Sequence, residues 1–208
     1  MHAIITDGSI SKYINHPKSL VIGDVRYPAR IFSAWTASEL AAIGIIEVTF
    51  DDSKKKNEQW YIITNQTYTY DADAGTVTAA YGNATAKAHA DTTWSQQDSD
   101  DGDLPSDKEV GDVKVEGLKT TLIRTLKQQV AGILNDTDWY ITRNAEKSTA
   151  IPSAISTHRD AVRTKQAEME TAITNASNTP ALETLYTYTE QSDGSVTRPL
   201  GELPTLEN

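Results

Sequence analysis

In the first part of the chain, apolar and polar positions alternate over short runs. Ala3–Thr6 and Ile10–Ile14 lie on either side of Asp7-Gly8, a dipeptide typical of hairpin turns because glycine tolerates positive φ. Other runs rich in aliphatic, aromatic and β-branched residues predict further strands, with Gly23-Asp24 as a second turn: Leu20–Ile22, Val25–Tyr27, Ile45–Phe50, Trp60–Thr64, Thr67–Tyr70 and Val77–Tyr81. The pattern therefore predicts a small, mostly antiparallel β module over residues 1–85.

One short helix is expected inside this module. Thr36 can accept a hydrogen bond from the amide of Glu39, and Glu39 can reach back to the amide of Thr36, which is the pattern of a capping box. The helix is predicted over Ala37–Ile43 and ends at Gly44, a residue type favoured just after helices. In the strand that follows, alternating positions are expected to face the core: Ile46, Val48 and Phe50.

Residues 86–109 differ in composition from the segments on both sides. The run Gln96–Asp103 is Gln-Gln-Asp-Ser-Asp-Asp-Gly-Asp. Low hydrophobicity and like charge disfavour burial, so this stretch is predicted to be an acidic linker between two modules. A protease is expected to cut first between Trp94 and Lys108.

A helical period begins after the linker and continues to about residue 185. Apolar residues recur at spacings of three and four, which favours an amphipathic helix: Val115, Leu118, Leu122, Leu126, Val130 and Ile133. Thr137 or Asp138 can cap a second helix that ends near Glu146. A third helix is expected from Pro152 to Ala176, and a short one around Leu182 and Leu185. We therefore predict a helical module over residues 110–185.

The last segment, residues 186–208, is predicted to be a hairpin followed by an extended arm. The arm has leucines at every third position, Leu200, Leu203 and Leu206, and its prolines disfavour a helix. Such an arm has no core of its own, so the leucines are expected to contact a partner chain or a sister copy. Removing Leu200–Asn208 is expected to leave the melting temperature of the monomer nearly unchanged and to weaken assembly with the fibre or the oligomer.

Together these segments predict an α+β protein with a small N-terminal β module, an acidic linker, and a C-terminal helical hairpin module with an extended tail. The 208 residues carry a formal net charge of -10 and no cysteine. This charge argues against binding to nucleic acid or to an anionic membrane surface, both of which need clustered cations. No apolar run is long enough to cross a membrane, and no secretory signal is expected.

The candidate chemistry is sparse. If Gly102 is placed at the loop glycine of a calcium-binding loop, Gln97 and Lys108 occupy positions that need carboxylates, so the motif fails. The four histidines have no metal-binding spacing, and no phosphate loop or nucleophile elbow occurs. We therefore expect no enzyme activity, no catalytic or metal-binding residue and no cofactor.

Trp139 and Tyr140 begin the second predicted helix, and arginines recur at Arg143, Arg159 and Arg163. These five residues are the candidate partner contacts of the helical module. For Trp139 a core position is favoured over a partner contact, because large aromatic side chains dominate core energetics. For Arg143 and Arg159, structural pairing is favoured over binding to a partner's carboxylates; the candidate acids are Asp136, Asp138 and Asp160.

Several of these residues also belong to a wider pattern: Leu134, Thr137-Asp138-Trp139, Arg143, Thr149-Ala150-Ile151-Pro152, Arg159 and Val162-Arg163. With them, the segment from Leu118 to about Leu185 resembles the C-terminal module of bacteriophage tail-fibre assembly proteins and related tail assembly chaperones. The N-terminal module resembles the small β domain that often precedes it, on the basis of Pro28, Ala41-Ala42-Ile43-Gly44-Ile45 and Val48. The resemblance implies a protein that helps to fold or cap fibrous tail proteins and needs no cofactor.

Three functions remain open at this point. The first is a tail-fibre assembly chaperone or accessory protein that stays bound to the fibre, acting in the host bacterial cytoplasm and in some cases in the virion tail. The second is a permanent structural component of the tail, baseplate or tail fibre. The third, an enzyme such as a glycan hydrolase, is disfavoured because its only support is scattered acidic pairs. The expected partner is a tail-fibre or baseplate protein, with self-association as a further possibility.

Overall fold

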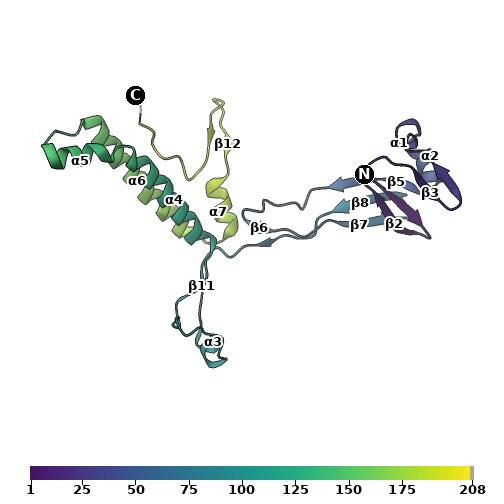
Figure 1. The fold of residues 1–208 in the computed structure, drawn as a ribbon, viewed down its shortest axis with the longest axis horizontal. Helices are drawn as coiled ribbons and strands as arrows, with labels where there is room; N and C mark the ends of the chain where they lie inside the picture. The colour runs from purple at the N-terminus through teal and green to yellow at the C-terminus, as the bar shows by residue number, and fades with distance from the viewer. Residues whose placement is uncertain (207–208) are drawn as a thin grey trace. The chain divides into compact units, whose positions relative to one another are not determined.

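A computed structural model describes residues 1–206 and divides the chain into two compact units, residues 1–85 and 86–208. Strands form the main sheet of the first unit and helices dominate the second (Figure 1). The predicted α+β class, with an N-terminal sheet and C-terminal helices, is confirmed. No helix within residues 1–206 combines the length and the apolar character that crossing a membrane requires.

The first unit is built on a five-stranded sheet with the order β2-β1-β5-β8-β7. Its strands are β1 (His2–Thr6), β2 (Ser9–Ile14), β5 (Ile45–Asp51), β7 (Thr67–Asp71) and β8 (Thr76–Ala80). The β5–β8 pair is parallel and the other neighbours are antiparallel, as a mostly antiparallel module requires. The rings of Tyr13 on β2 and Tyr68 on β7 lie 4.7 Å apart, so the sheet curls until its two edge strands meet.

Both faces of this sheet are covered by apolar side chains. One face buries Ala3, Val48, Val77 and Ala79, with partly buried tyrosines packed against them. The other face buries Ile45 against Ile31 and Leu40, which come from α1 (Ile31–Ala34) and α2 (Ala37–Ala42). The prediction for β5 is therefore correct for Val48, and Ile46 packs at the margin of the same cluster. It is wrong for Phe50, which is 49% exposed because the covered area ends before the last residues of β5.

Local chemistry accounts for α2. The amide of Thr36 donates to Glu39 Oε2 at 2.7 Å, and the amide of Glu39 donates to Thr36 Oγ1 at 3.3 Å, so the predicted capping box is present. Gly44 follows the helix with a φ of 78°. A Cβ atom at this position would lie 2.8 Å from the carbonyl oxygen of Ile5, so only glycine fits between α2 and β1.

Two small two-stranded sheets are also present. β3 (Leu20–Ile22) pairs with β4 (Val25–Tyr27) across the predicted turn at Gly23. β6 (Tyr61–Ile62) pairs with β9 (Thr85–Ala86), so the strand predicted over Trp60–Thr64 is shorter than expected. Trp60 itself is buried.

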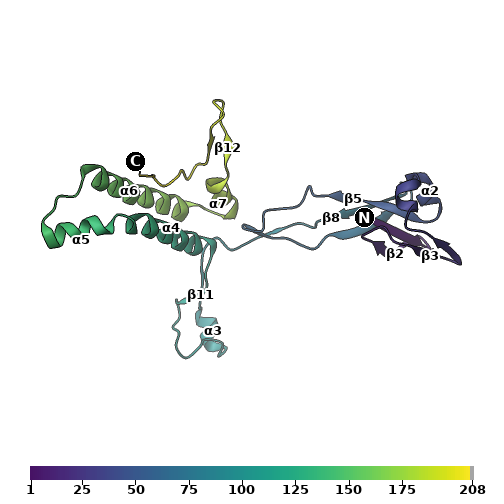
Figure 2. The same cartoon turned by 45° about the horizontal axis from the view of Figure 1, so that its top comes forward.

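The second unit is organised around two long helices, α4 (Leu118–Asn135) and α6 (Ser153–Asn175), which lie side by side (Figure 2). They are joined through α5 (Asp138–Lys147), and α7 (Thr179–Tyr186) follows α6. These bounds agree with the predicted helices to within a few residues, except that Val115 is exposed in a strand. The buried residues of α4 and α6 include an apolar set: Leu126, Val130, Ile155, Val162, Met169 and Ile173.

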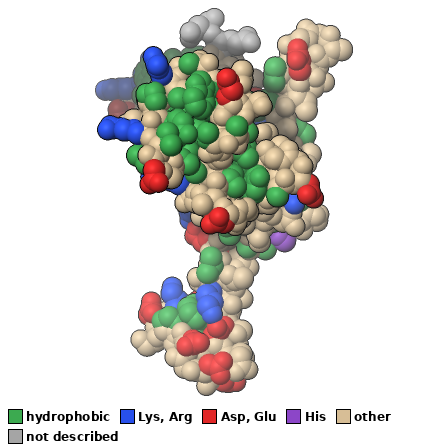
Figure 3. All heavy atoms as spheres, turned by 90° about the vertical axis from the view of Figure 1, so that its right-hand side faces the viewer, with side chains coloured by type: hydrophobic (Ala, Val, Ile, Leu, Met, Phe, Trp, Pro, Cys, Tyr) green, Lys and Arg blue, Asp and Glu red, His purple; other side chains and the backbone are tan. Residues whose placement is uncertain are grey.

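The segment predicted to be an acidic linker contains a folded lobe. Residues 92–115 form a lobe in which β10 (Thr92–Thr93) pairs with β11 (Val113–Val115) and α3 (Gln96–Asp100) lies between them. We call this the α3 lobe. Ser95 and Asp98 form a capping box, and Lys114 makes an ion pair with Asp98 while its Nζ lies 4.3 Å from the ring centroid of Trp94. Figure 3 shows acidic side chains gathered on this lobe.

The segment that leads into the α3 lobe is hydrogen-bonded to the helices. Asp91 accepts from the amide of Gly117 at 2.6 Å and from Thr120 Oγ1 at 2.8 Å. Thr179 Oγ1 donates to the carbonyl of Lys87 at 2.6 Å. These polar contacts attach the segment to the second unit. Its hydropathy alone could not predict them.

Candidate partner-binding surface

The helix α5 packs against little of its own unit. None of its residues is buried, whereas α4 buries two residues and α6 buries six. In both views α5 lies beyond the end of α4 and carries the chain toward α6 (Figures 1 and 2). Trp139 is 51% exposed and Ile141 is 41% exposed. The helix α5 therefore leaves two large apolar side chains, Trp139 and Ile141, substantially exposed in the described structure.

The aromatic side chains of α5 are ordered by a stack. The ring centroids of Trp139 and Tyr140 are 3.8 Å apart, and the guanidinium carbon of Arg143 lies 4.7 Å from the Trp139 ring and 5.4 Å from the Tyr140 ring. Cation–π contacts of this length hold an arginine over a ring face. Arg143 Nε is buried in this stack and has no hydrogen-bond partner within the described residues. The three side chains therefore form one preformed cluster, which we call the α5 stack.

The α5 stack corrects two predictions. The core position favoured for Trp139 is wrong, because its ring stacks on its own helix and half of it faces solvent. The structural pairing expected for Arg143 is also wrong, since no ion pair joins it to a carboxylate in residues 1–206. In both cases the reason is the same: the buried row between α4 and α6 does not extend under α5.

Arg159 fixes the junction from which α5 begins. From α6, its Nη1 donates to the carbonyl of Leu134 at 2.7 Å and to Thr137 Oγ1 at 2.6 Å, and its Nη2 lies 2.8 Å from Asp138 Oδ1. The Arg159 side chain is only 8% exposed. A planar guanidinium can serve these three acceptors at once, and the last carbonyls of a helix need such donors. The prediction of structural pairing for Arg159, with Asp138 among its partners, is confirmed.

Arg163 is separate from this junction. Its Nη1 lies 3.5 Å from Asp160 Oδ1 on the same exposed face of α6. Such a surface pair contributes little to stability. Of the five helical candidates, the structure thus brings together Trp139, Tyr140 and Arg143, while Arg159 and Arg163 form intramolecular pairs. Sequence reasoning missed Ile141, whose exposure depends on the missing packing around α5.

The C-terminal arm packs on a surface of its own unit. Leu200 is 3% exposed, and its amide donates to the carbonyl of Leu185 at 3.0 Å. Leu203 lies beside Ile133 and Asp136, and Leu206 is the more exposed end of this stretch. The expectation that the arm lacks a core contact is therefore wrong for Leu200. A contact of these leucines with a partner stays a prediction, and positions 207 and 208 lie outside the described residues.

Hydrogen bonds from the preceding hairpin hold the arm. The hairpin pairs β12 (Thr189–Glu190) with β13 (Val196–Thr197), as predicted. Arg198 contacts Glu202 at 2.8 Å, and Tyr188 Oη donates to Glu202 Oε1 at 2.6 Å, which raises the pKa of Tyr188. The arm therefore follows the surface of the helical pair, although no local pattern in its sequence predicts this.

A second candidate site in the first unit was also missed. Lys12, Lys18 and Arg26 surround a hollow with an apolar floor, which we call the basic hollow. The three residues are spread over fifteen positions and follow no motif spacing, so only the fold brings them together.

Within residues 1–206, no group of three or more histidines and carboxylates is placed to hold a metal ion. The pKa of Asp98 is held far below its ordinary value by the ion pair with Lys114 and by hydrogen bonds from Ser95, so this carboxylate is already fully engaged.

Comparisons with known proteins add no relationship to these observations. No protein-family model, no curated protein and no solved structure matches this chain.

Proposed function

We propose that this chain is a non-enzymatic binding protein of a bacteriophage tail, acting as an assembly chaperone or accessory protein that contacts a tail-fibre chain through α5. The observation that carries the proposal is the uncovered state of α5. An isolated helix of about ten residues is marginal in water, and most helices gain their stability by burying an apolar face. In α5 no residue is buried, and Trp139 and Ile141 remain exposed in the described structure.

The α5 stack has the chemistry of a binding hot spot. Trp, Tyr and Arg are the residue types that most often dominate binding energy at protein interfaces. Their side chains are already held together by stacking, so little conformational freedom would be lost on binding. Arg159 holds the start of the helix in place, which makes the surface rigid at its base.

The binding free energy expected from burying Trp139 is large enough for a specific contact. A tryptophan side chain buries roughly 150–250 Å² when it is fully covered. About half of Trp139 is still accessible. Covering that remainder, roughly 100 Å², contributes about 2.5 kcal/mol at about 25 cal/mol per Å². This corresponds to a change in dissociation constant of about 70-fold.

The assignment to a phage tail comes from the sequence resemblance. Trp139, Arg143 and Arg159 are among the residues that carry it. Fibre chains expose sheet edges and apolar faces before they assemble, and a small protein with an open aromatic surface can cover them. The sequence resemblance and the exposed α5 stack together support contact with a tail-fibre chain.

The test is capture of a tail-fibre chain from infected-cell lysate by the tagged full-length protein. We expect a tail-fibre chain to be retained by the parent and largely lost with Trp139→Ala and with Arg143→Ala. Trp35→Ala is the matched control, because Trp35 is a partly exposed tryptophan of the first unit that packs edge-on against Tyr27. All variants should keep their helical content.

Two results would contradict the proposal. One is the absence of any tail protein from the parent eluate. The other is equal retention by Trp139→Ala and Trp35→Ala. Quantitative mass spectrometry of purified particles then separates an accessory protein that stays bound, present in fixed proportion to the fibre, from a chaperone found only in the lysate.

A further inference from the structure

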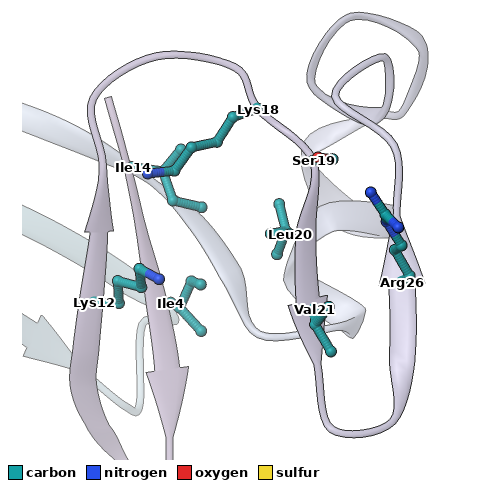
Figure 4. Close-up of a pocket in the computed structure, with 8 residues that line it drawn as sticks. All are labelled: Ile4, Lys12, Ile14, Lys18, Ser19, Leu20, Val21 and Arg26. Carbon is teal, nitrogen blue, oxygen red and sulfur yellow. The ribbon is translucent and has the colours of Figure 1, made fainter.

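The basic hollow is a depression of about 400 Å³ in the first unit (Figure 4). Its floor is formed by Ile4 on β1 and Ile14 on β2, both of which are buried. Leu20 and Val21 on β3 form the facing wall. The hollow therefore lies between the β1–β2 hairpin and the β3–β4 hairpin, and its volume is within the range of roughly 300–1,000 Å³ common for binding sites.

Three cations border this apolar floor. Lys12 comes from β2, Lys18 from the loop between β2 and β3, and Arg26 from β4. Figure 4 shows the side-chain nitrogens of Lys12 and Lys18 beside Ile4 and Ile14, with Arg26 on the other side of the space. No aspartate or glutamate is among the residues that line it.

These cations have no partner within the described residues. Neither an ion pair nor a side-chain hydrogen bond joins Lys12, Lys18 or Arg26 to residues 1–206. Residues 1–85 contain seven lysines and arginines against nine aspartates and glutamates, so close to half of the basic residues of this unit surround one hollow. Three positive side chains close together repel one another in the free protein. An anion bound among them offsets this repulsion.

The wall of the hollow also offers backbone groups. β3 pairs with β4, and within residues 1–206 no strand pairs with its other edge. Every second residue of an edge strand turns its amide and carbonyl outward, and an extended peptide can pair with them. Val21 and Val25 on this hairpin are 61% and 52% exposed, and Figure 3 shows hydrophobic side chains gathered on the face of the first unit turned to the viewer.

We propose that the basic hollow binds an extended acidic peptide segment of a partner protein. The segment adds to the open edge of β3, one of its apolar side chains enters the floor over Ile4 and Ile14, and flanking carboxylates meet Lys12, Lys18 and Arg26. The charge of the rim selects carboxylates, and the strand edge beside an apolar floor selects an extended chain over a small anion. This site is independent of α5, so it stands whether or not the α5 surface binds a tail fibre.

The experiment measures binding of the full-length protein to a fluorescein-labelled peptide that alternates leucine and glutamate. A matched peptide carries glutamine in place of glutamate. We expect the acidic peptide to bind at least about tenfold more tightly than the glutamine peptide, because charge complementarity across a binding surface discriminates between partners. Combining Lys12→Gln, Lys18→Gln and Arg26→Gln should weaken the acidic peptide by about tenfold or more.

A triple variant outside the hollow is the control. Lys54→Gln, Lys55→Gln and Lys56→Gln together change the net charge of the same unit by the same amount and should alter binding by less than about twofold. The hollow variant should keep its melting temperature, because its three side chains make no ion pair to lose. Val21→Asp, which places a carboxylate at the rim, should also weaken the acidic peptide.

Each remaining outcome overturns the proposal. If both triple variants weaken binding equally, the peptide responds only to net charge. If a peptide alternating serine and glutamate binds as well as the leucine peptide, or if inorganic pyrophosphate displaces the peptide completely, the hollow is a site for small anions. If the acidic peptide does not bind the parent protein, the hollow is not a peptide site.

Discussion

Replacing Arg159 by alanine removes the side chain that joins three parts of the helical unit: the end of α4, the α4–α5 junction and α6. The guanidinium is buried and donates to Leu134 O and Thr137 Oγ1 at 2.7 and 2.6 Å. Hydrogen bonds from a charged donor contribute about 1.5–3 kcal/mol each. The carbonyl of Leu134 keeps a bond from Thr137 Oγ1 at 3.0 Å, so the loss is smaller than the sum of the two bonds.

The contact with Asp138 adds little to this loss. The Asp138 side chain is 55% exposed, and an ion pair open to solvent contributes about 1 kcal/mol or less. Together with the buried aliphatic stem of the arginine, we expect Arg159→Ala to lower the free energy of unfolding by about 3 kcal/mol. For a unit of this size the melting temperature should fall by about 10–15 °C.

The assay is thermal unfolding of the full-length protein, followed by the helical signal in far-UV circular dichroism. Arg163→Ala is the control, since the Arg163–Asp160 pair is exposed on both sides and should matter by less than about 0.5 kcal/mol. Arg159→Lys should lose about half as much as alanine, because an ammonium group cannot serve three acceptors in a plane. A melting temperature of Arg159→Ala within about 2 °C of that of Arg163→Ala would refute the role given to this junction.

Two further predictions follow from the arm and the α3 lobe. Ending the chain after Pro199 should lower the melting temperature by about 5–10 °C, because burial of a leucine such as Leu200 contributes about 1.5–3 kcal/mol; an unchanged transition would show that the arm is not packed in solution. The α3 lobe should lose stability progressively as the pH falls from about 4 toward the depressed pKa of Asp98, because a carboxyl pKa held below its ordinary value of 3.8 stabilises the fold only while the carboxylate stays charged. Amide protection at Ser95 and Asp98 should therefore decline with acid, and this decline should be much weaker in Lys114→Met; protection independent of pH in the parent would contradict the argument.

The parts of the fold that could be predicted from sequence depend on residues close together in the chain. Asp7-Gly8 specifies a hairpin and Thr36 with Glu39 specifies a helix start, because the interacting atoms are within a few residues of one another. The spacing of Leu126 and Val130 likewise identified the buried face of α4. In each case the local chemistry and the tertiary structure favour the same conformation.

The candidate sites could not be predicted in this way. Whether Trp139 is core or surface depends on how far the α4–α6 contact extends, which is a long-range property. Leu200 was expected to need a partner because its own neighbours in sequence offer no core, yet a surface of the same unit covers it. The basic hollow combines Lys12 with Arg26 only after two hairpins have packed together.

The contact between Asp91 and Gly117 has a consequence for how the chain can vary. The two residues are 26 positions apart and are joined by a hydrogen bond of 2.6 Å, and a Cβ at Gly117 would lie 2.3 Å from the carbonyl carbon of Ala90. The chain between Asp91 and Gly117 runs away from the helices and returns to the same point. Because loop closure costs only slightly more for a longer loop, a segment with such closed ends can be lengthened, shortened or replaced while α4 starts in the same place. The α3 lobe is therefore a natural insertion point, where a new recognition element or a fused reporter domain could be carried without disturbing the helices that follow.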